Sequence, residues 1–438
     1  MSYSVGAVSL GCNKNRVDTE TALGLLKDHG YRIVSDPSLA DILLVNTCGF
    51  IDPAKEESIN TILEMAEYKQ RGSCRLLVVT GCLSQRYEKD LMSELPEIDL
   101  LLGVNQYAQL PKLIDQALKG QRIHACSDDL SYFEQKRVLT TPGYSAYIRI
   151  GEGCSNRCTF CAIPLIRGPY RSRSEDHILQ EISDLALQGV REHILIAQDT
   201  TRWGTDHGGH TQLPALMRKA AEIEGVEWLR VLYCYPDETN EELLDLLASH
   251  PKICPYLDIP VQHIHPDILK RMHRRGTRED ILRCIRGAKK RGLTLRTTLI
   301  TGFPGETEDQ FRELLDFVAE AEFDRLGAFA YSPEEGTPAA RMPDQIPEEI
   351  KQDRLDRLMT LQSTISLKQN QKRVGTTERV LVTDLNDQGM ALGRSRREVP
   401  EEDGEILIRL KEKQPEIGSF ISVKITQADT YDLTGEMV

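Results

Sequence analysis

The sequence predicts an α/β protein of three domains, and three observations carry this prediction. Over the first 125 or so residues, short apolar runs alternate with helical stretches, which is typical of a parallel sheet covered by helices. Between residue 144 and about residue 330, six further strand-like runs alternate with helices. From residue 377 the runs are short and β-like, and 438 residues is the length of about three domains. We therefore expect domains over residues 1–128, 140–372 and 375–438.

In the first domain, three apolar runs end in the same way. Residues 5–10, 42–47 and 76–80 are each followed by a cysteine beside a glycine, which gives Cys12, Cys48 and Cys82. The carboxyl ends of parallel strands share one edge of a sheet, so we expect the three thiols to converge there. The alternative is that they are buried small hydrophobes. We expect that simpler role for the cysteines without this context, which are Cys74, Cys126, Cys234, Cys254 and Cys284.

The central domain is expected to be an open, TIM-like partial barrel of six units, (β/α)6. Its strand-like runs cover residues 146–150, 193–197, 228–232, 256–259, 294–300 and 325–329. The roughly 190 residues that they span are too few for eight β/α units, which take about 250. The active site of such a barrel lies at the carboxyl ends of its strands. A helix should follow Ser174, because this capping residue precedes the acidic pair Glu175 and Asp176.

Just past the first of these runs stand Cys154, Cys158 and Cys161. Three thiolates can hold three corners of a 4Fe-4S cluster and leave the fourth iron open to a substrate or cofactor. The alternatives are a zinc knot or buried cysteines. A zinc site needs a fourth ligand, and the sequence offers none nearby.

The C-terminal domain is expected to be a small antiparallel, OB-like β-barrel. Its β runs cover residues 377–384, 390–392, 405–408 and 419–427, after a proline-rich loop at 331–347 and a charged helix that ends near 374. Residues 375–438 contain 8 Lys and Arg against 13 Asp and Glu. A barrel that reads RNA should be basic, so this acidic domain favours a basic protein as its partner.

Charge and composition exclude several classes of protein. The net charge of -13 argues against broad electrostatic capture of nucleic acid or of an acidic membrane. The first residues do not resemble a secretion leader, and no run approaches 18 apolar residues. We therefore expect a cytoplasmic protein that uses no membrane. Its eleven cysteines suit metal ligation better than disulfides in that compartment.

Four segments together resemble the methylthiotransferases, which are radical S-adenosylmethionine (SAM) enzymes with an auxiliary cluster on an N-terminal domain. They are residues 9–15, 46–50, 80–82 and the triplet at 154–161. The resemblance implies two 4Fe-4S clusters and SAM as cofactors, and it names the C-terminal barrel a TRAM domain. By this match Cys12, Cys48 and Cys82 hold the auxiliary cluster, whereas Cys154, Cys158 and Cys161 hold the SAM cluster. No catalytic residue is expected beyond the clusters.

The same resemblance implies a SAM and substrate cavity built from strand ends. Its expected cofactor-binding residues are Phe160, Gln198, Asp199, Gln262, Gly302 and Pro304, and the alternative for each is an ordinary turn or core residue. His263 and His265 are expected to be structural. Arg167, Arg171 and Arg173 are expected either to bind a carboxylate of SAM or substrate, or to be solvated. The basic stretch at 273–291 is expected to be a solvated helix face, with contact to ribosomal RNA as the alternative.

The substrate is inferred from finer motifs. Residues 235–236, 256–263 and 428–435 look like those of the family members that methylthiolate the β-carbon of an aspartate in the twelfth small-subunit ribosomal protein. A side-chain base cannot activate that C–H bond, which explains the radical cofactor; one SAM would be the radical source and a second the methyl donor. The expected partners are this basic ribosomal protein and an electron donor such as flavodoxin or ferredoxin, and direct RNA binding should not dominate. The alternatives are a tRNA adenosine C2 methylthiotransferase and a non-catalytic iron-sulfur protein.

Overall fold

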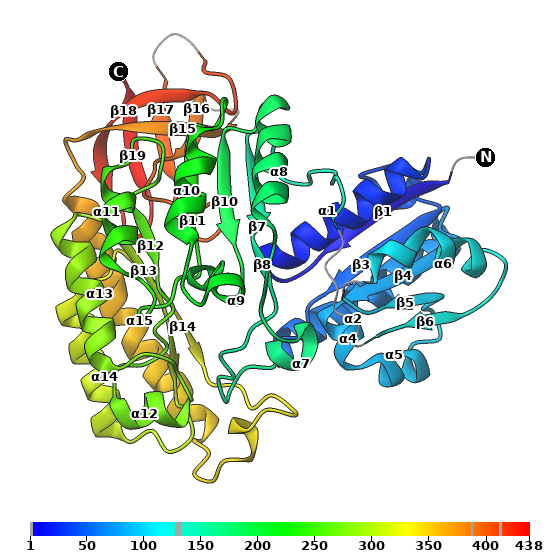
Figure 1. Ribbon diagram of the computed structural model, residues 1–438, viewed down its shortest axis with the longest axis horizontal. Helices are drawn as coiled ribbons and strands as arrows, with labels where there is room; N and C mark the ends of the chain where they lie inside the picture. The colour runs from blue at the N-terminus through cyan, green and yellow to red at the C-terminus, as the bar shows by residue number, and fades with distance from the viewer. Residues whose placement is uncertain (1–2, 105, 128–133, 387–388, 411–413) are drawn as a thin grey trace.

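The computed structural model describes residues 3–104, 106–127, 134–386, 389–410 and 414–438. Figure 1 shows the N-terminal domain at the right, the central domain at the left, and the C-terminal barrel above the central domain. The predicted α/β fold class is confirmed. No helix in the described ranges is both long and apolar enough to cross a bilayer.

The N-terminal domain is a parallel sheet with the strand order β2-β1-β3-β4-β5-β6. Its strands are β1 (Ser4–Ser9), β2 (Arg32–Ile33), β3 (Ile42–Thr47), β4 (Leu76–Gly81), β5 (Leu100–Leu102) and β6 (Ile123–Ala125). Its helices are α1 (Asn13–Asp28), α2 (Asp52–Ala66), α3 (Tyr68–Arg71), α4 (Cys82–Arg86), α5 (Glu88–Glu94) and α6 (Leu110–Ala117). β3 and β4 are buried along their whole length, as expected for central strands covered on both faces. This explains why their apolar runs were easy to recognise.

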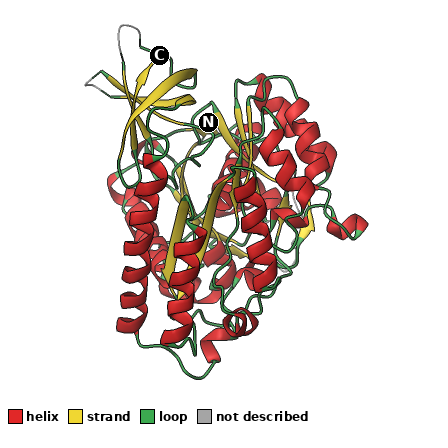
Figure 2. Ribbon diagram, turned by 90° about the vertical axis from the view of Figure 1, so that its left-hand side faces the viewer, coloured by secondary structure: helices red, strands yellow, loops and turns green. Residues whose placement is uncertain are grey.

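The central domain is the predicted open half-barrel. Its strands form two parallel groups, β11-β10-β7 and β12-β13-β14, joined by a bridge between Leu229 and Ile253 and by a hydrogen bond from the Cys234 backbone to the Asp258 carbonyl. These strands are β7 (Ser145–Arg149), β10 (Glu192–Ile196), β11 (Trp228–Val231), β12 (Tyr256–Asp258), β13 (Thr294–Thr301) and β14 (Arg325–Ala330). The long helices are α8 (Glu175–Leu187), α10 (Leu213–Glu222), α11 (Glu241–Ser249), α13 (Arg278–Lys290), α14 (Glu308–Ala321) and α15 (Glu348–Gln371). Figure 2 shows helices on the outside of these strands.

Short elements connect this framework at the end that carries the cysteines. They are β8 (Gly151–Glu152), β9 (Arg171–Ser172), α7 (Ile163–Arg167), α9 (Thr205–Gly208) and α12 (Pro266–Arg271). β8 and β9 pair with each other in antiparallel fashion and enclose the triplet. As predicted, Ser174 caps α8, and its hydroxyl accepts a hydrogen bond from the His177 backbone.

The C-terminal domain is a closed five-stranded barrel with the order β15-β16-β17-β19-β18. The strands are β15 (Thr377–Leu385), β16 (Met390–Arg394), β17 (Ile406–Arg409), β18 (Phe420–Ala428) and β19 (Leu433–Met437). The prediction of a wholly antiparallel barrel is wrong in one pairing, because β17 and β19 run parallel. β19 was not predicted as a strand, since its five residues with a central glycine show little alternation of apolar and polar side chains. Closing the barrel requires it, because β17 and β18 would otherwise be left as edges.

All three domains meet in one apolar cluster inside the half-barrel. It contains Val17 of α1, Trp228 and Tyr256 of the central strands, and Leu381 and Val399 of the C-terminal domain. Polar bonds reinforce the cluster. The Arg394 guanidinium donates to buried Glu192 at 2.8 Å, and the Tyr256 hydroxyl donates to Asp403 at 2.7 Å. The C-terminal barrel is therefore part of the core of the molecule.

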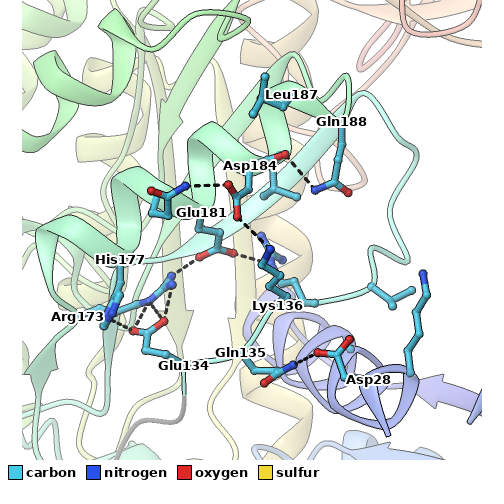
Figure 3. Close-up of a pocket in the computed structure, with 16 residues that line it drawn as sticks. Asp28, Glu134, Gln135, Lys136, Arg173, His177, Glu181, Asp184, Leu187 and Gln188 are labelled. Atoms are coloured by element: carbon cyan, nitrogen blue, oxygen red, sulfur yellow. Dashed lines mark hydrogen bonds and ion pairs between the residues drawn. The ribbon is translucent and has the colours of Figure 1, made fainter. Parts of the chain in front are cut away.

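A second junction joins α1 to α8 through the segment that links the first two domains. Arg137 donates to Glu20 of α1 at 2.5 Å and to Glu181 of α8 at 2.6 Å. Arg173 binds Glu134 at 2.7 Å and also pairs with Glu181 (Figure 3). Arg173 therefore lies in a charged cleft between the domains. The two roles predicted for it, a SAM or substrate contact and a solvated position, are both wrong.

Candidate active site

The first cysteine set lies at the carboxyl edge of the N-terminal sheet. Cys12 immediately precedes α1, Cys48 follows β3, and Cys82 opens α4 just after β4. A Cβ atom on Gly11 would lie 2.7 Å from the Cys48 Cβ and 2.9 Å from its sulfur, so only glycine fits beside that thiol. Burial, with the neighbouring thiols of Cys12 and Cys48, raises the pKa of Cys82 to about 12. Cys48 and Cys82 are buried and Cys12 is exposed, so the set is open on one side to a positively charged inorganic group, which would make the thiolate forms stable.

The second set lies between β8 and α7. The Cys154 backbone donates to the Gly168 carbonyl, and the Cys161 backbone donates to the Cys158 carbonyl, each at 3.0 Å. Gly153 has a φ of +72°, and a Cβ there would lie 2.2 Å from the Pro169 carbonyl oxygen. Burial, with the thiols of its neighbours in the set, raises the pKa of Cys161 to about 12. The loop is thus fixed before any ligand binds.

Neither set is arranged for a single ion. In the described ranges, no three His, Cys, Asp or Glu side chains are grouped closely enough to hold one metal ion. The observations that fit a larger group are the two sets of three thiols, all of them buried or half-buried except exposed Cys12, and the glycines that clear space beside them. Of the other cysteines, Cys74, Cys234, Cys254 and Cys284 are buried, as predicted. Cys126 is half-buried and directly follows β6, so it shares the sheet edge of the first set, which was not foreseen.

Each cysteine set has a guanidinium within reach of a sulfur, that of buried Arg167 for the first set and that of half-buried Arg274 for the second. Arg167, at the end of α7, is 3.5 Å from the Cys82 sulfur, 2.8 Å from Asp18 and 3.1 Å from Glu152. Arg274 is 3.5 Å from the Cys158 sulfur and donates to the Tyr235 hydroxyl at 2.8 Å. Both arginines therefore place positive charge beside a thiol of a cysteine set.

Two sequence expectations about these arginines are wrong. Arg167 was expected to bind a ligand carboxylate or to be solvated, but only 1% of it is exposed and its donors serve protein groups. Arg274 belongs to the basic stretch that was expected to be solvated, yet it contacts Cys158. Spacing along the chain gives no signal for either contact, because each joins segments more than 80 residues apart. Arg171 is half-buried, and its guanidinium donates to the Pro169 carbonyl at 3.0 Å.

The predicted cofactor-binding residues fall into two groups. Phe160 and Gln262 line a cavity, and Gln198 is half-buried beyond β10, with its buried amide nitrogen and oxygen both unpaired among the described residues. The other three are engaged in protein contacts. Asp199 accepts from Asn156 at 2.9 Å, the Gly302 backbone donates to Glu306 at 2.6 Å, and the Pro304 carbonyl accepts from Arg271 at 2.9 Å. A buried amide without partners is the feature that most clearly calls for a polar ligand.

The two histidines have the structural roles predicted for them. His263 is fully buried and lies 3.0 Å from Glu306, whose carboxylate also binds Arg354 at 2.7 Å. His265 caps α12 by accepting from the Asp267 backbone at 3.2 Å. Neither is therefore free to hold a metal.

The cavity has a volume of about 600 Å³ and lies between the N-terminal domain and the carboxyl ends of β13 and β14. Residues 50–53 form one wall, and Thr298, Ile300 and residues 328–334 form the other. Its size suits a small molecule or a short peptide loop. A ligand there would touch both domains.

A half-barrel with a three-cysteine loop after its first strand, joined to a parallel-sheet domain with a second set, is the arrangement of a two-cluster radical SAM enzyme. Family models agree: residues 148–318 match the radical SAM superfamily, 4–103 the uncharacterized protein family UPF0004, and 374–438 the TRAM domain. The chain is 51% identical to the ribosomal protein uS12 methylthiotransferase RimO of Clostridium kluyveri, over 98% of this chain and 97% of that one. The RimO protein of Desulforamulus reducens is 49% identical over 99% of each chain.

Solved structures show the same fold. The radical SAM methyltransferase TsrM from Kitasatospora setae has a TM-score of 0.57 at 18% identity, over 77% of each chain. The radical SAM enzyme OxsB has a TM-score of 0.51 at 16% identity, over 83% of this chain and 56% of that one. The chain belongs to the RimO family of ribosomal protein uS12 methylthiotransferases.

Proposed function

We propose that this protein transfers a methylthio group to the β-carbon of an aspartate in ribosomal protein uS12. The observation that carries the proposal is the identity of about half of all residues with RimO proteins over the whole chain, with both cysteine sets present. The family uses two 4Fe-4S clusters and SAM. When bound, these cofactors supply a carbon-centred radical and a methylthio group. A tRNA adenosine substrate and a non-catalytic role are not favoured by these relatives.

The side chains described above would then have separate roles in binding the clusters and SAM. Cys12, Cys48 and Cys82 would hold the auxiliary cluster, and Cys154, Cys158 and Cys161 the SAM cluster. Gln198 would hydrogen-bond SAM, because its amide has no other partner. Phe160 and Gln262 would contact SAM from the cavity wall. Asp199, Gly302 and Pro304 would hold the walls of the SAM site in position and would not bind SAM themselves, since their polar groups already bind protein groups.

We also propose the setting of the reaction. The partners are uS12, as for the RimO relatives, and a one-electron donor protein such as flavodoxin or ferredoxin, in the cytoplasm. The acidic TRAM domain supports a basic protein partner over RNA. The three domains proposed from the sequence, 1–128, 140–372 and 375–438, are each supported by a separate sheet or barrel.

A reaction with purified components tests the function. Reconstituted protein, SAM and a reductant are incubated with uS12 or with unmodified tRNA, and the products are analysed by mass spectrometry. We expect a methylthio group on one aspartate of uS12 and none on tRNA. Modification of tRNA alone, or cleavage of SAM without modification of uS12, would reject the proposal.

Iron analysis of cysteine variants tests the ligands. Two 4Fe-4S clusters correspond to about eight irons per chain. We expect Cys82→Ala and Cys158→Ala each to lose about four, whereas the control Cys74→Ala, which changes a buried cysteine outside both sets, keeps all eight. Full iron content in both ligand variants would disprove the assignment.

A further inference from the structure

The loop that carries Cys158 is covered by residues 270–275. The Thr159 backbone donates to the Met272 carbonyl, and the Thr159 hydroxyl donates to the Arg271 carbonyl, both at 2.9 Å. The His273 ring nitrogen Nδ1 lies 3.2 Å from the Arg157 carbonyl oxygen. Beneath this cover Arg274 reaches the Cys158 sulfur. The cysteine loop and residues 270–275 together therefore cover Cys158.

This surface carries unpaired positive charge. Arg157, Lys270 and Arg271 are exposed, and we call them the cation patch; the His273 ring is exposed beside them. Across the ranges that the structure covers, none of the three cations forms an ion pair with an acid. The acids Asp237 and Glu238 lie near it, but Arg275 pairs with both, at 2.7 and 3.7 Å. Asp267, at the opposite end of α12, faces His265. An uncompensated basic patch is notable in a protein of net charge -13.

The proposed chemistry requires an electron from outside the protein at this place. Complexes that exchange electrons are usually small and transient, and complementary charge raises the rate at which they form. Arg274, from the same segment as Lys270 and Arg271, lies 3.5 Å from the Cys158 sulfur, and Arg157 directly precedes Cys158, so the patch adjoins the second cysteine set. RNA is the other acidic partner that a basic patch could bind. RNA binding, however, would not require a patch beside Cys158, whereas electron transfer would.

We propose that the cation patch is the docking surface for an acidic electron-carrier protein, which reduces the cluster held by Cys154, Cys158 and Cys161. The inference rests on the proposed function. The step moves one electron: the flavin or iron-sulfur centre of the carrier is oxidised by one electron, and the cluster is reduced by one. No bond forms or breaks, and no proton is transferred.

The test compares two charge-reversal variants of the reconstituted holoenzyme. One is the patch variant Arg157→Glu/Lys270→Glu. The control is Lys289→Glu/Lys290→Glu, which makes the same change of net charge at the far end of α13, where both lysines are exposed. Anaerobic stopped-flow absorbance follows cluster reduction by reduced flavodoxin, by reduced ferredoxin and by dithionite, at low and high salt.

We expect the patch variant to be reduced about tenfold or more slowly by at least one carrier at low salt, since steering by charge changes association rates by that much. The control should keep the wild-type rate, dithionite should reduce all three proteins equally, and added salt should slow only the wild type and the control. Equal rates with both carriers, or an equal slowing with dithionite, would overturn the proposal. So would a patch variant that loses only ribosomal RNA binding. If dithionite drives no uS12 modification in the wild type, the proposed function itself fails.

Discussion

At the scale of single residues, the most consequential feature is the guanidinium beside each cysteine set, from buried Arg167 and half-buried Arg274. Arg167 ties α7, which follows the second set, to Asn15 and Asp18 of α1, which follows Cys12. Hydrogen bonds to cluster sulfurs and nearby charge help to set the reduction potential of a cluster. If each set holds a cluster as proposed, Arg167 and Arg274 would each help to set the reduction potential of one of them.

Replacing Arg167 with methionine should destabilise the protein strongly. Asp18 and Glu152 would lose one of their buried partners, and breaking a buried ion pair costs about 3–5 kcal/mol. Urea denaturation of the cluster-free protein measures the change. The control Arg16→Met breaks the more exposed pair with Glu401, which should cost about 1 kcal/mol or less. Equal losses in the two variants would contradict the structural role of Arg167.

His193 should make the protein sensitive to mild acid. Burial lowers the pKa of this histidine to about 4 from an ordinary value of 6.5. As the pH falls from about 6.5 to 4, His193 takes up a proton in the unfolded chain but not in the folded chain. The free energy of unfolding therefore falls, by a total on the order of 3 kcal/mol. Chemical denaturation of the wild type and of His193→Phe across this range tests the effect. Parallel curves for the two proteins would show that His193 does not titrate in this way.

At the scale of elements, α1 joins the first cysteine set to the central domain. It begins after Cys12, and its interior Gly24 packs against the segment that links the two domains. A Cβ atom on Gly24 would lie 2.0 Å from the Lys136 carbonyl oxygen. The close approach of helix and chain therefore requires glycine.

Gly24→Ala should lower the melting temperature, although alanine is the better helix former by about 1 kcal/mol. The new methyl group would push α1 away from residues 136–137 and weaken the junction shown in Figure 3. Gly143→Ala is the matched control, because nothing lies within 4 Å of its added Cβ. Scanning calorimetry measures both. A stabilised Gly24→Ala would mean that helix propensity outweighs this contact.

The elements also show which features of the fold can be predicted from the sequence. The central strands and the cysteines after them were predicted correctly, because apolar runs and a parallel topology together fix which edge those residues occupy. The contacts of Arg167 and Arg274, the close approach at Gly24 and the parallel pairing of β19 were not foreseen. Each depends on segments that are distant in the chain and meet only after folding.

At the scale of the whole molecule, the C-terminal barrel completes the central domain. Leu381 and Val399 pack with Trp228 and Tyr256, and Arg394 neutralises the buried Glu192. From the acidic charge of this barrel, the sequence predicts a basic protein as its partner. Its structural role was not predictable, since the strands that it covers also read as ordinary core strands.

Removing residues 375–438 should therefore destabilise the central domain. The truncated chain would expose the cluster around Trp228 and leave Glu192 with one fewer partner. We expect a large loss of cooperative unfolding and increased hydrogen exchange in β10 and β11. The full-length control Glu227→Gln, which weakens an exposed ion pair with Arg379, should melt like the wild type. A truncated chain that melts normally would show that the barrel is an independent appendage.

The central claim is that this two-cluster protein modifies uS12, and mass spectrometry of uS12 from cells tests it most directly. A strain without the gene is complemented with the wild type, with Cys82→Ala or with Cys158→Ala. The account predicts a methylthio group on one aspartate of uS12 only with the wild type, and unchanged methylthiolation of tRNA in every strain. Modified uS12 in the strain without the gene, or in either cysteine variant, would contradict it.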